Sequence, residues 1–293
     1  MDHTARIEQC LERSIAKATA RHCPPKLSKA VQSSVFPGGA RVRPQLTMAV
    51  ASACGADFGS ADGACVEGAA AAVELMHCAS LVHDDLPCFD DADTRRGKPS
   101  VHALYGEEIA VLVGDALIVQ AFAALAEGCA NVPERLAALV DLVVNAVGMS
   151  GGITAGQAWE SEANVNVEEY HCAKTGSLFV GAVSAGALAV GSDPLPWRPL
   201  GARIGEAYQL ADDLLDAVGS VEESGKPVGQ DAVHNRPSAV AQFGFKDTVN
   251  RLSRVVDEAV ASIPPCDGDA DLRGLIAAQA KRLVPSSVAV QAA

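Results

Sequence analysis

Two clusters of aspartates interrupt otherwise apolar helical stretches of this chain. They consist of Asp84, Asp85, Asp90 and Asp91, and of Asp212, Asp213 and Asp216. Ionised carboxylates repel one another and are costly in apolar surroundings, so such clusters indicate bound divalent cations or close pairing with basic groups. Oxygen-only ligands suit magnesium, which bridges protein carboxylates to substrate phosphates. The two clusters therefore predict a magnesium-dependent diphosphate site.

Hydrophobic periodicity predicts an all-α fold. Apolar residues recur at helical spacing in most segments, and alternating β-branched runs bounded by hairpin turns are almost absent. No linker long enough to separate domains interrupts the pattern, so we expect one domain over residues 1–293. The expected helices cover residues 4–20, 26–35, 42–54, 62–85, 107–128, 133–148, 168–190, 198–219, 237–242, 246–262 and 270–284.

Charge and cysteine usage narrow the class of protein. A formal net charge of -13 argues against general affinity for nucleic acid or anionic lipid, so we expect small molecules or other subunits as partners. The nine cysteines are scattered singly and are interpreted as packing residues of a cytoplasmic protein. The uncharged stretch Thr175–Ser192 is rich in glycine and alanine, which indicates a core helix and no membrane span.

The first cluster lies at the end of a predicted helix. Glu74, His77 and Asp84 are spaced so that they share one face of that helix. Carboxylates at a helix C-terminus oppose the helix dipole and need another reason to be there. Pro87 disfavours continuation of the helix, and the cationic segment 95–98 follows. Acidic and basic groups are therefore expected side by side at this turn.

The second cluster is also helical. Asp212 and Asp216 are four residues apart and project together, with Asp213 beside them, and repulsion at this spacing is mildly destabilising without a bridging ion. Lys226 and Arg236 follow in a stretch that contains glycine and proline. Because the two clusters are far apart in sequence, antiparallel helices could bring both to one cavity.

These segments resemble the trans-prenyl diphosphate synthases. His83–Pro99 is similar to the first aspartate-rich motif of that family, and Asp212–Asp216 is similar to the second. The resemblance covers nearly the whole chain. Further segments that fall in the family's order are Phe36–Gly39, Arg41–Pro44, Gly114–Asp115, Gly156–Gln157, Lys174–Gly176 and Tyr208–Gln209.

The resemblance implies head-to-tail condensation of isopentenyl diphosphate with an allylic diphosphate. It also implies a helical bundle around a deep central cavity, a homodimer, and three magnesium ions that help the allylic carbon ionise by neutralising the departing diphosphate. The metal ligands that it implies are Asp84, Asp85, Asp90, Asp212 and Asp216, the last acting through water. With Lys174 and Lys226, the first four of these would form the catalytic set.

The resemblance also implies which residues contact the substrates. The allylic diphosphate clamp would be Arg95, Lys174, Thr175, Gln209 and Lys226, and the isopentenyl diphosphate site Arg43, His77 and Arg96. In three places the chain departs from the family pattern. Ala40 and Arg236 stand where the family has lysines, and Glu160 stands where the family has an aspartate. Arg236 is still expected to bind substrate.

Product length is expected to depend on the helix below the first aspartates. Ala79 lies five residues before Asp84, about 7.5 Å along the helix, and an aromatic residue there would close the cavity near a fifteen-carbon tail. Ala79 and Ser80 leave room for a C20 product, as in geranylgeranyl diphosphate synthases of bacterial carotenoid pathways, although Val111, Leu112 and Phe122 could line the cavity floor. The alternatives are a farnesyl diphosphate synthase and a non-catalytic partner subunit.

Overall fold

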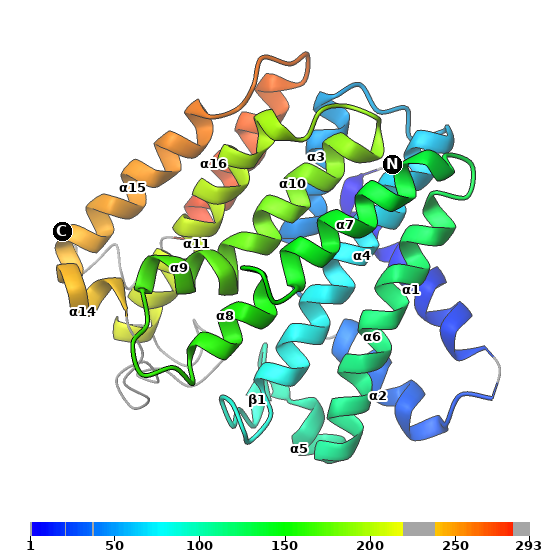
Figure 1. Cartoon of the computed structure of the whole chain (residues 1–293), viewed down its shortest axis with the longest axis horizontal. Helices are drawn as coiled ribbons and strands as arrows, with labels where there is room; N and C mark the ends of the chain where they lie inside the picture. The colour runs from blue at the N-terminus through cyan, green and yellow to red at the C-terminus, as the bar shows by residue number, and fades with distance from the viewer. Residues whose placement is uncertain (1, 21, 37, 219–237, 284–293) are drawn as a thin grey trace. The chain divides into compact units, whose positions relative to one another are not determined.

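The computed structural model describes residues 2–20, 22–36, 38–218 and 238–283, which are mostly helical (Figure 1). The described strands are β1 (Thr94–Arg95) and β2 (Lys98–Pro99), paired as one antiparallel hairpin. The all-α prediction is confirmed. The helices are α1 His3–Thr19, α2 Pro25–Val35, α3 Val42–Ala53, α4 Ala61–Asp84, α5 Val101–Tyr105, α6 Glu107–Gly128, α7 Leu136–Val147, α8 Ile153–Trp159, α9 Val167–His171, α10 Ser177–Ala189, α11 Arg198–Val218, α14 Ala239–Phe243, α15 Phe245–Ala261 and α16 Asp269–Leu283.

The long helices agree closely with the predicted ranges, whereas short elements were missed. Helices α5 and α8 and the hairpin fall in stretches too short to show a clear period. The helix expected over residues 168–190 is divided into α9, a π-helical turn at Cys172–Gly176, and α10. Such π turns are single turns inserted within helices, and one turn is too short for a hydrophobic pattern to identify.

Contacts divide the chain into two compact units. The first comprises Met1–Asp141 with Ala185–Ser192, and the second comprises Leu142–Ser184 with Asp193–Ala293. The expectation of a single domain over the whole chain stays a prediction, and each unit is described by itself.

In the first unit, α4 packs along α6 and α3 (Figure 1). Gly68 of α4 and Gly128 of α6 allow the two backbones to approach closely, because a Cβ on Gly68 would lie 2.6 Å from the carbonyl oxygen of Ala124. The α4 side chains of Val66 and of Ala69–Val73 are almost completely buried. The helix that ends in the first aspartate cluster is therefore held rigidly along its length.

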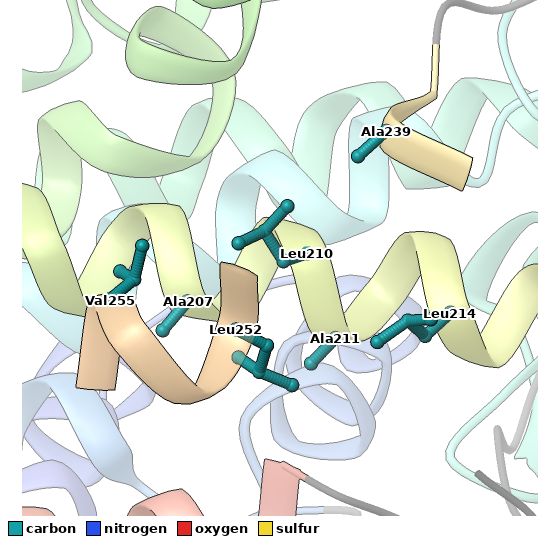
Figure 2. Close-up of a cluster of buried hydrophobic side chains, with 7 residues drawn as sticks. All are labelled: Ala207, Leu210, Ala211, Leu214, Ala239, Leu252 and Val255. Carbon is teal, nitrogen blue, oxygen red and sulfur yellow. The ribbon is translucent and has the colours of Figure 1, made fainter. Parts of the chain in front are cut away.

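In the second unit, α11 packs against α15 and α14 around a small apolar cluster (Figure 2). Its members are Ala207, Leu210, Ala211, Leu214, Ala239, Leu252 and Val255. On another side of α11, a Cβ on Gly205 would lie 2.6 Å from the Cα of Gly176 in the π turn. This close approach places the π turn beside the helix that carries the second aspartate cluster.

Three stretches are long and apolar enough to cross a membrane: α4, α6 and Val167–Ala189. In the protein, 78% of the apolar window of α4 and 67% of that of Val167–Ala189 is buried, against 39% for α6. Burial inside the protein accounts for the apolar character of the first and third stretches. The expectation that the chain has no membrane span stays a prediction.

Candidate active site

The first aspartate cluster folds back on the end of α4. The Asp90 N–H donates to the Asp84 carbonyl oxygen at 2.9 Å, and the Ala92 N–H donates to the Asp85 carbonyl oxygen at 3.1 Å. Since Pro87 follows immediately after the helix, the chain turns instead of continuing. These backbone bonds bring Asp90 to the end of the helix beside Asp84.

Arg95 from β1 binds the carboxylates of this turn. Its Nε and Nη2 donate to Asp85 Oδ1 at 2.9 and 2.5 Å, and its Nη2 lies 3.9 Å from Asp84 Oδ2. Asp85 is buried, and burial raises the pKa of its carboxyl while the hydrogen bonds from Arg95 oppose that rise. Arg95, expected at the allylic diphosphate, is therefore bound to the first aspartate cluster, where its hydrogen bonds favour the charged form of Asp85.

Arg96 lies at the tip of the β1–β2 hairpin. Arg96 and Gly97 have φ angles of 54° and 71°, the left-handed conformation that a tight two-residue hairpin turn requires. The Arg96 side chain extends to the loop before α3, where Nη1 donates to the Gly38 carbonyl oxygen at 2.7 Å. A Cβ on Gly39 would lie 2.6 Å from Arg96 Nη1. The paired glycines therefore leave space for this guanidinium, one residue from Ala40.

Arg43 and His77, both expected at the isopentenyl diphosphate site, are in contact. Arg43 Nη1 lies 3.2 Å from His77 Nε2. Burial, followed by the positive charges of Arg43 and neighbouring arginines, lowers the pKa of His77 well below its usual value. The imidazole is consequently neutral at pH 7, and its Nε2 accepts the hydrogen bond from Arg43.

In the second unit, Glu160 is the shared acceptor of three polar groups. Its Oε1 accepts from Lys174 Nζ at 2.5 Å and from the Tyr170 hydroxyl at 2.6 Å, and its Oε2 accepts from Gln157 Nε2 at 2.9 Å. Lys174 lies in the π turn, close to the backbone of Gly156 in α8. The glutamate that replaces the family's aspartate therefore holds the lysine expected to bind substrate.

Thr175, Gln209 and Asp213 form a chain of hydrogen bonds. The Thr175 hydroxyl donates to Gln209 Oε1 at 2.8 Å, and Gln209 Nε2 donates to Asp213 Oδ1 at 2.8 Å. Asp213 Oδ2 accepts from the Ala239 N–H at 2.6 Å. Asp213 is buried, whereas Asp212 is exposed and Asp216 half-buried. The second cluster is therefore split between an inward-facing aspartate and two accessible ones.

Sequence analysis missed this role of Asp213. The available signal was its spacing of four residues from Gln209, which places the two on one face of α11. The roles of Tyr170 and Gln157 had no comparable signal, because their contacts to Glu160 depend on the folding of α8 and α9.

Oxygen ligands at both clusters fit magnesium, although they do not form a complete cage. Among the described residues, no three His, Cys, Asp or Glu side chains are grouped so that they could hold a metal ion. Magnesium usually binds through one or two carboxylates, with waters and substrate phosphates as its other ligands. Asp84 and Asp90 at the end of α4, and Asp212 and Asp216 one turn apart on α11, supply carboxylates that could serve in this way.

The remaining candidates are two residues expected to set product length and two expected to bind substrate. Ala79 is buried in α4, and the half-buried Ser80 donates its hydroxyl hydrogen to the His77 carbonyl oxygen at 2.9 Å. Lys226 and Arg236 lie outside the described residues.

One interpretation of the sequence needs correction. Cys88 and Cys172 are exposed and are not packing residues. Residue type alone does not show which face of a helix or turn is covered. Val111 and Leu112 are exposed on α6, and their place on a cavity floor stays a prediction.

Comparison with known proteins gives the family. A family profile described as polyprenyl synthetase matches residues 24–269. The chain belongs to the polyprenyl synthetase family. This polyprenyl synthetase is 49% identical to a geranylgeranyl diphosphate synthase from Cereibacter sphaeroides, over 98% of each chain. It is 35% identical to a farnesyl diphosphate synthase from Geobacillus stearothermophilus, over 90% of this chain and 89% of that one.

Solved structures confirm the fold of the polyprenyl synthetase. A Helicobacter pylori geranyltransferase, described as complexed with magnesium and isoprenyl diphosphate, superposes with a TM-score of 0.80 and 27% sequence identity. The match covers 96% of this chain and 98% of that chain. The resemblance to the trans-prenyl diphosphate synthases is thus confirmed for family and fold.

Proposed function

We propose that this polyprenyl synthetase condenses isopentenyl diphosphate with allylic diphosphates and releases geranylgeranyl diphosphate, a C20 product. The observation that carries the proposal is the 49% identity over 98% of the chain to the Cereibacter sphaeroides geranylgeranyl diphosphate synthase. The farnesyl diphosphate synthase alternative is less supported, since its relative from Geobacillus stearothermophilus is 35% identical. Both aspartate clusters are intact, which disfavours a non-catalytic partner subunit.

Magnesium, proposed as three ions, would be held by Asp84, Asp85, Asp90, Asp212 and Asp216. Bound there, it neutralises charge on the departing diphosphate so that the allylic carbon can ionise. Arg95 donates to Asp85 Oδ1 and opposes the rise that burial causes in the pKa of that carboxyl. This contact therefore favours the charged form of Asp85, which is the form that binds cations.

Lys174, Thr175 and Gln209 would bind and orient the allylic diphosphate. Lys174 is positioned by Glu160, and the Thr175 hydroxyl is oriented by Gln209. A diphosphate carries more charge than a single carboxylate, so it can compete for the Lys174 ammonium when it binds. Lys226 and Arg236 would complete this set.

Arg43, His77 and Arg96 would bind isopentenyl diphosphate. The neutral His77 accepts from Arg43 and leaves the guanidinium's positive charge available to the substrate. Arg96, extended over the paired glycines, supplies positive charge near the position where Ala40 provides none. These two arginines compensate in part for the missing lysine.

The small side chain of Ala79 supports a C20 product. It lies about 7.5 Å along α4 from Asp84 and adds little bulk to the helix. Growth beyond fifteen carbons would then stay possible. We also propose that the product enters carotenoid or other isoprenoid synthesis and that the enzyme is cytoplasmic, which its nine free cysteines support.

A homodimer is the proposed assembly. Helix α6 exposes the large apolar side chains of Val111, Leu112 and Val119, the last with 68% of its surface accessible. Val111, Leu112 and Val119 recur at helical spacing, and a second copy of the chain would cover them. Light scattering coupled to size exclusion should give twice the 30.1 kDa chain mass. A monomer would contradict this assembly, and so would a dimer that forms only when detergent is present.

Product analysis tests the proposed function directly. Purified enzyme is incubated with magnesium, dimethylallyl diphosphate and isopentenyl diphosphate, and the products are measured by mass spectrometry. We expect a dominant C20 diphosphate, and little or no turnover with the Asp84→Ala variant. A dominant C15 product would favour the farnesyl alternative. Unchanged turnover in Asp84→Ala would contradict the metal assignment, and an inactive wild type would favour the partner subunit.

A further inference from the structure

Arg41 is a buried arginine that none of the expected substrate contacts uses. Its guanidinium donates from Nε to Glu8 Oε1 at 2.7 Å, from Nη1 to Glu74 Oε1 at 2.7 Å, and from Nη2 to the Val35 carbonyl oxygen at 2.6 Å. Arg41 and Glu74 expose only 3% and 1% of their surfaces. Burying such charges is costly unless they are paired, and here each donor direction has a partner.

The Arg41–Glu74 ion pair is a close neighbour of the Arg43–His77 contact. Arg41 precedes α3 and is two residues before Arg43, while Glu74 is one turn before His77 on α4. The ion pair and the 3.2 Å Arg43–His77 contact therefore join the start of α3 to the same stretch of α4. The ion pair consequently limits how far α3 can shift or rotate against α4.

The same guanidinium also closes the loop before α3. Its bond to the Val35 carbonyl oxygen ties Arg41 to the end of α2, on the other side of the segment that precedes α3. Gly38 within that segment accepts the hydrogen bond from Arg96. Arg41 itself has a φ of 46°, an unfavourable left-handed backbone that persists where surrounding contacts enforce it. The Arg41 side chain therefore holds the start of α3, which carries Arg43, and the loop whose Gly38 carbonyl binds Arg96.

We infer that Arg41 and Glu74 are positioning residues for isopentenyl diphosphate, acting through Arg43, His77 and Arg96 without touching the substrate. The inference rests on the proposed function of this site. With alanine at position 40, binding depends on the remaining cations, whose placement before substrate arrives reduces the entropy lost on binding. The buried pair supplies that placement.

Arg41→Lys is the most informative substitution. Lysine keeps the charge, but one ammonium on a flexible stem cannot reproduce a planar fork that spans Glu8, Glu74 and the Val35 carbonyl. The matched control is Arg135→Lys in the same unit. Arg135 likewise binds a carboxylate, Asp62, at 2.7 Å and a backbone carbonyl oxygen, that of Ala189, and both of these partners belong to helices other than α3.

Steady-state kinetics with each substrate varied separately tests the inference. For Arg41→Lys we expect the KM for isopentenyl diphosphate to rise about tenfold, equivalent to one lost hydrogen bond of ordinary strength, with kcat and the allylic KM within about twofold of the wild type. Arg135→Lys should leave both KM values unchanged. An unchanged isopentenyl KM in Arg41→Lys, or equal increases in both KM values, would overturn the inference.

Two further measurements keep the test decisive. If Arg41→Lys does not fold, Glu8→Gln weakens the same network at its half-exposed partner and should raise the isopentenyl diphosphate KM alone. Calorimetric binding of isopentenyl diphosphate to wild type and variants gives the same comparison without turnover. An active wild type with unaltered binding by the variants would refute only the positioning role. A wild type that elongates no allylic diphosphate would refute the proposed function.

Discussion

The Asp213 carboxylate accepts the Ala239 N–H at 2.6 Å, so the middle aspartate of the second cluster anchors the start of α14 to α11. Its other oxygen accepts from Gln209, which in turn is bonded to Thr175. Three aspartates close in sequence therefore have two kinds of task. Asp212 and Asp216 are accessible to ligands, and Asp213 connects the proposed diphosphate clamp to the protein interior.

Substitution should separate these tasks. Asp213→Asn replaces one acceptor oxygen by a donor, so the bond from Gln209 or the bond from Ala239 is lost, at a cost of about 1–3 kcal/mol in the free energy of unfolding. Asp212→Asn should leave stability nearly unchanged and lower kcat by about a hundredfold, because charge stabilisation of the leaving group weakens. Thermal unfolding and turnover check both effects. A fall in kcat for Asp213→Asn without loss of stability would place Asp213 among the ligands.

Glu160→Gln should alter allylic substrate binding. The amide retains an acceptor for Lys174 and Tyr170 but removes the negative charge that competes with diphosphate for the lysine. We expect the allylic KM to fall about threefold, while the KM for isopentenyl diphosphate is unchanged. Initial rates with geranyl diphosphate measure this change. A higher allylic KM would mean that orienting Lys174 matters more than reducing the competition.

His77 should make stability depend on pH. Its pKa in the folded protein is lowered well below the usual value of about 6.5, so below about pH 6.5 the unfolded chain binds a proton that the folded protein excludes. Stability due to His77 is fully present above pH 6.5 and decreases as the pH falls, by up to about 1.4 kcal/mol per pH unit. Urea unfolding between pH 5 and 8 measures the slope. His77→Gln, which does not titrate, should show a shallower slope, and equal slopes would contradict the neutral imidazole.

Thiol labelling should report ligand binding at the first cluster. Iodoacetamide at neutral pH should modify the exposed Cys88, and the buried Cys65 and Cys78 should resist because burial also raises their pKa values, that of Cys78 to about 12. Magnesium with inorganic diphosphate should slow labelling of Cys88, because Cys88 lies between Asp85 and Asp90. Peptide mass spectrometry measures each rate, with Cys23 as internal reference. Equal rates with and without ligand would place the diphosphate elsewhere.

Ala79→Phe should shorten the product from C20 to C15. The aromatic ring adds bulk one and a half turns before Asp84 and would limit the growing chain, at a packing cost of about 1–3 kcal/mol. Ser80→Ala changes polarity without bulk and should leave the product length unaltered. Mass spectrometry of the reaction products distinguishes the two variants. A C20 product from Ala79→Phe would show that chain length is limited at another position.

Local patterns were sufficient for the long helices and the family, but not for the partners of individual side chains. The bend after Asp84 was predictable from Pro87, and the shared face of Glu74 and His77 from helical spacing. The partner of Glu74 was not, because Arg41 lies on a different segment and no periodicity relates the two. The π turn that carries Lys174 was not predicted either, because a single turn within a helix is too short to show in the hydrophobic pattern.

The sequence by itself determined an all-α chain of the polyprenyl synthetase family, with aspartate clusters on two helices, since helical period and motif order are local properties. Only the tertiary structure decided which charged groups face ligands and which hold the protein together. Asp213 and Glu74 are both acidic and lie in or near the motifs, yet each is buried against a donor from another segment. The cost of burying an unpaired charge makes those long-range partners decisive, and they exist only once the chain has folded.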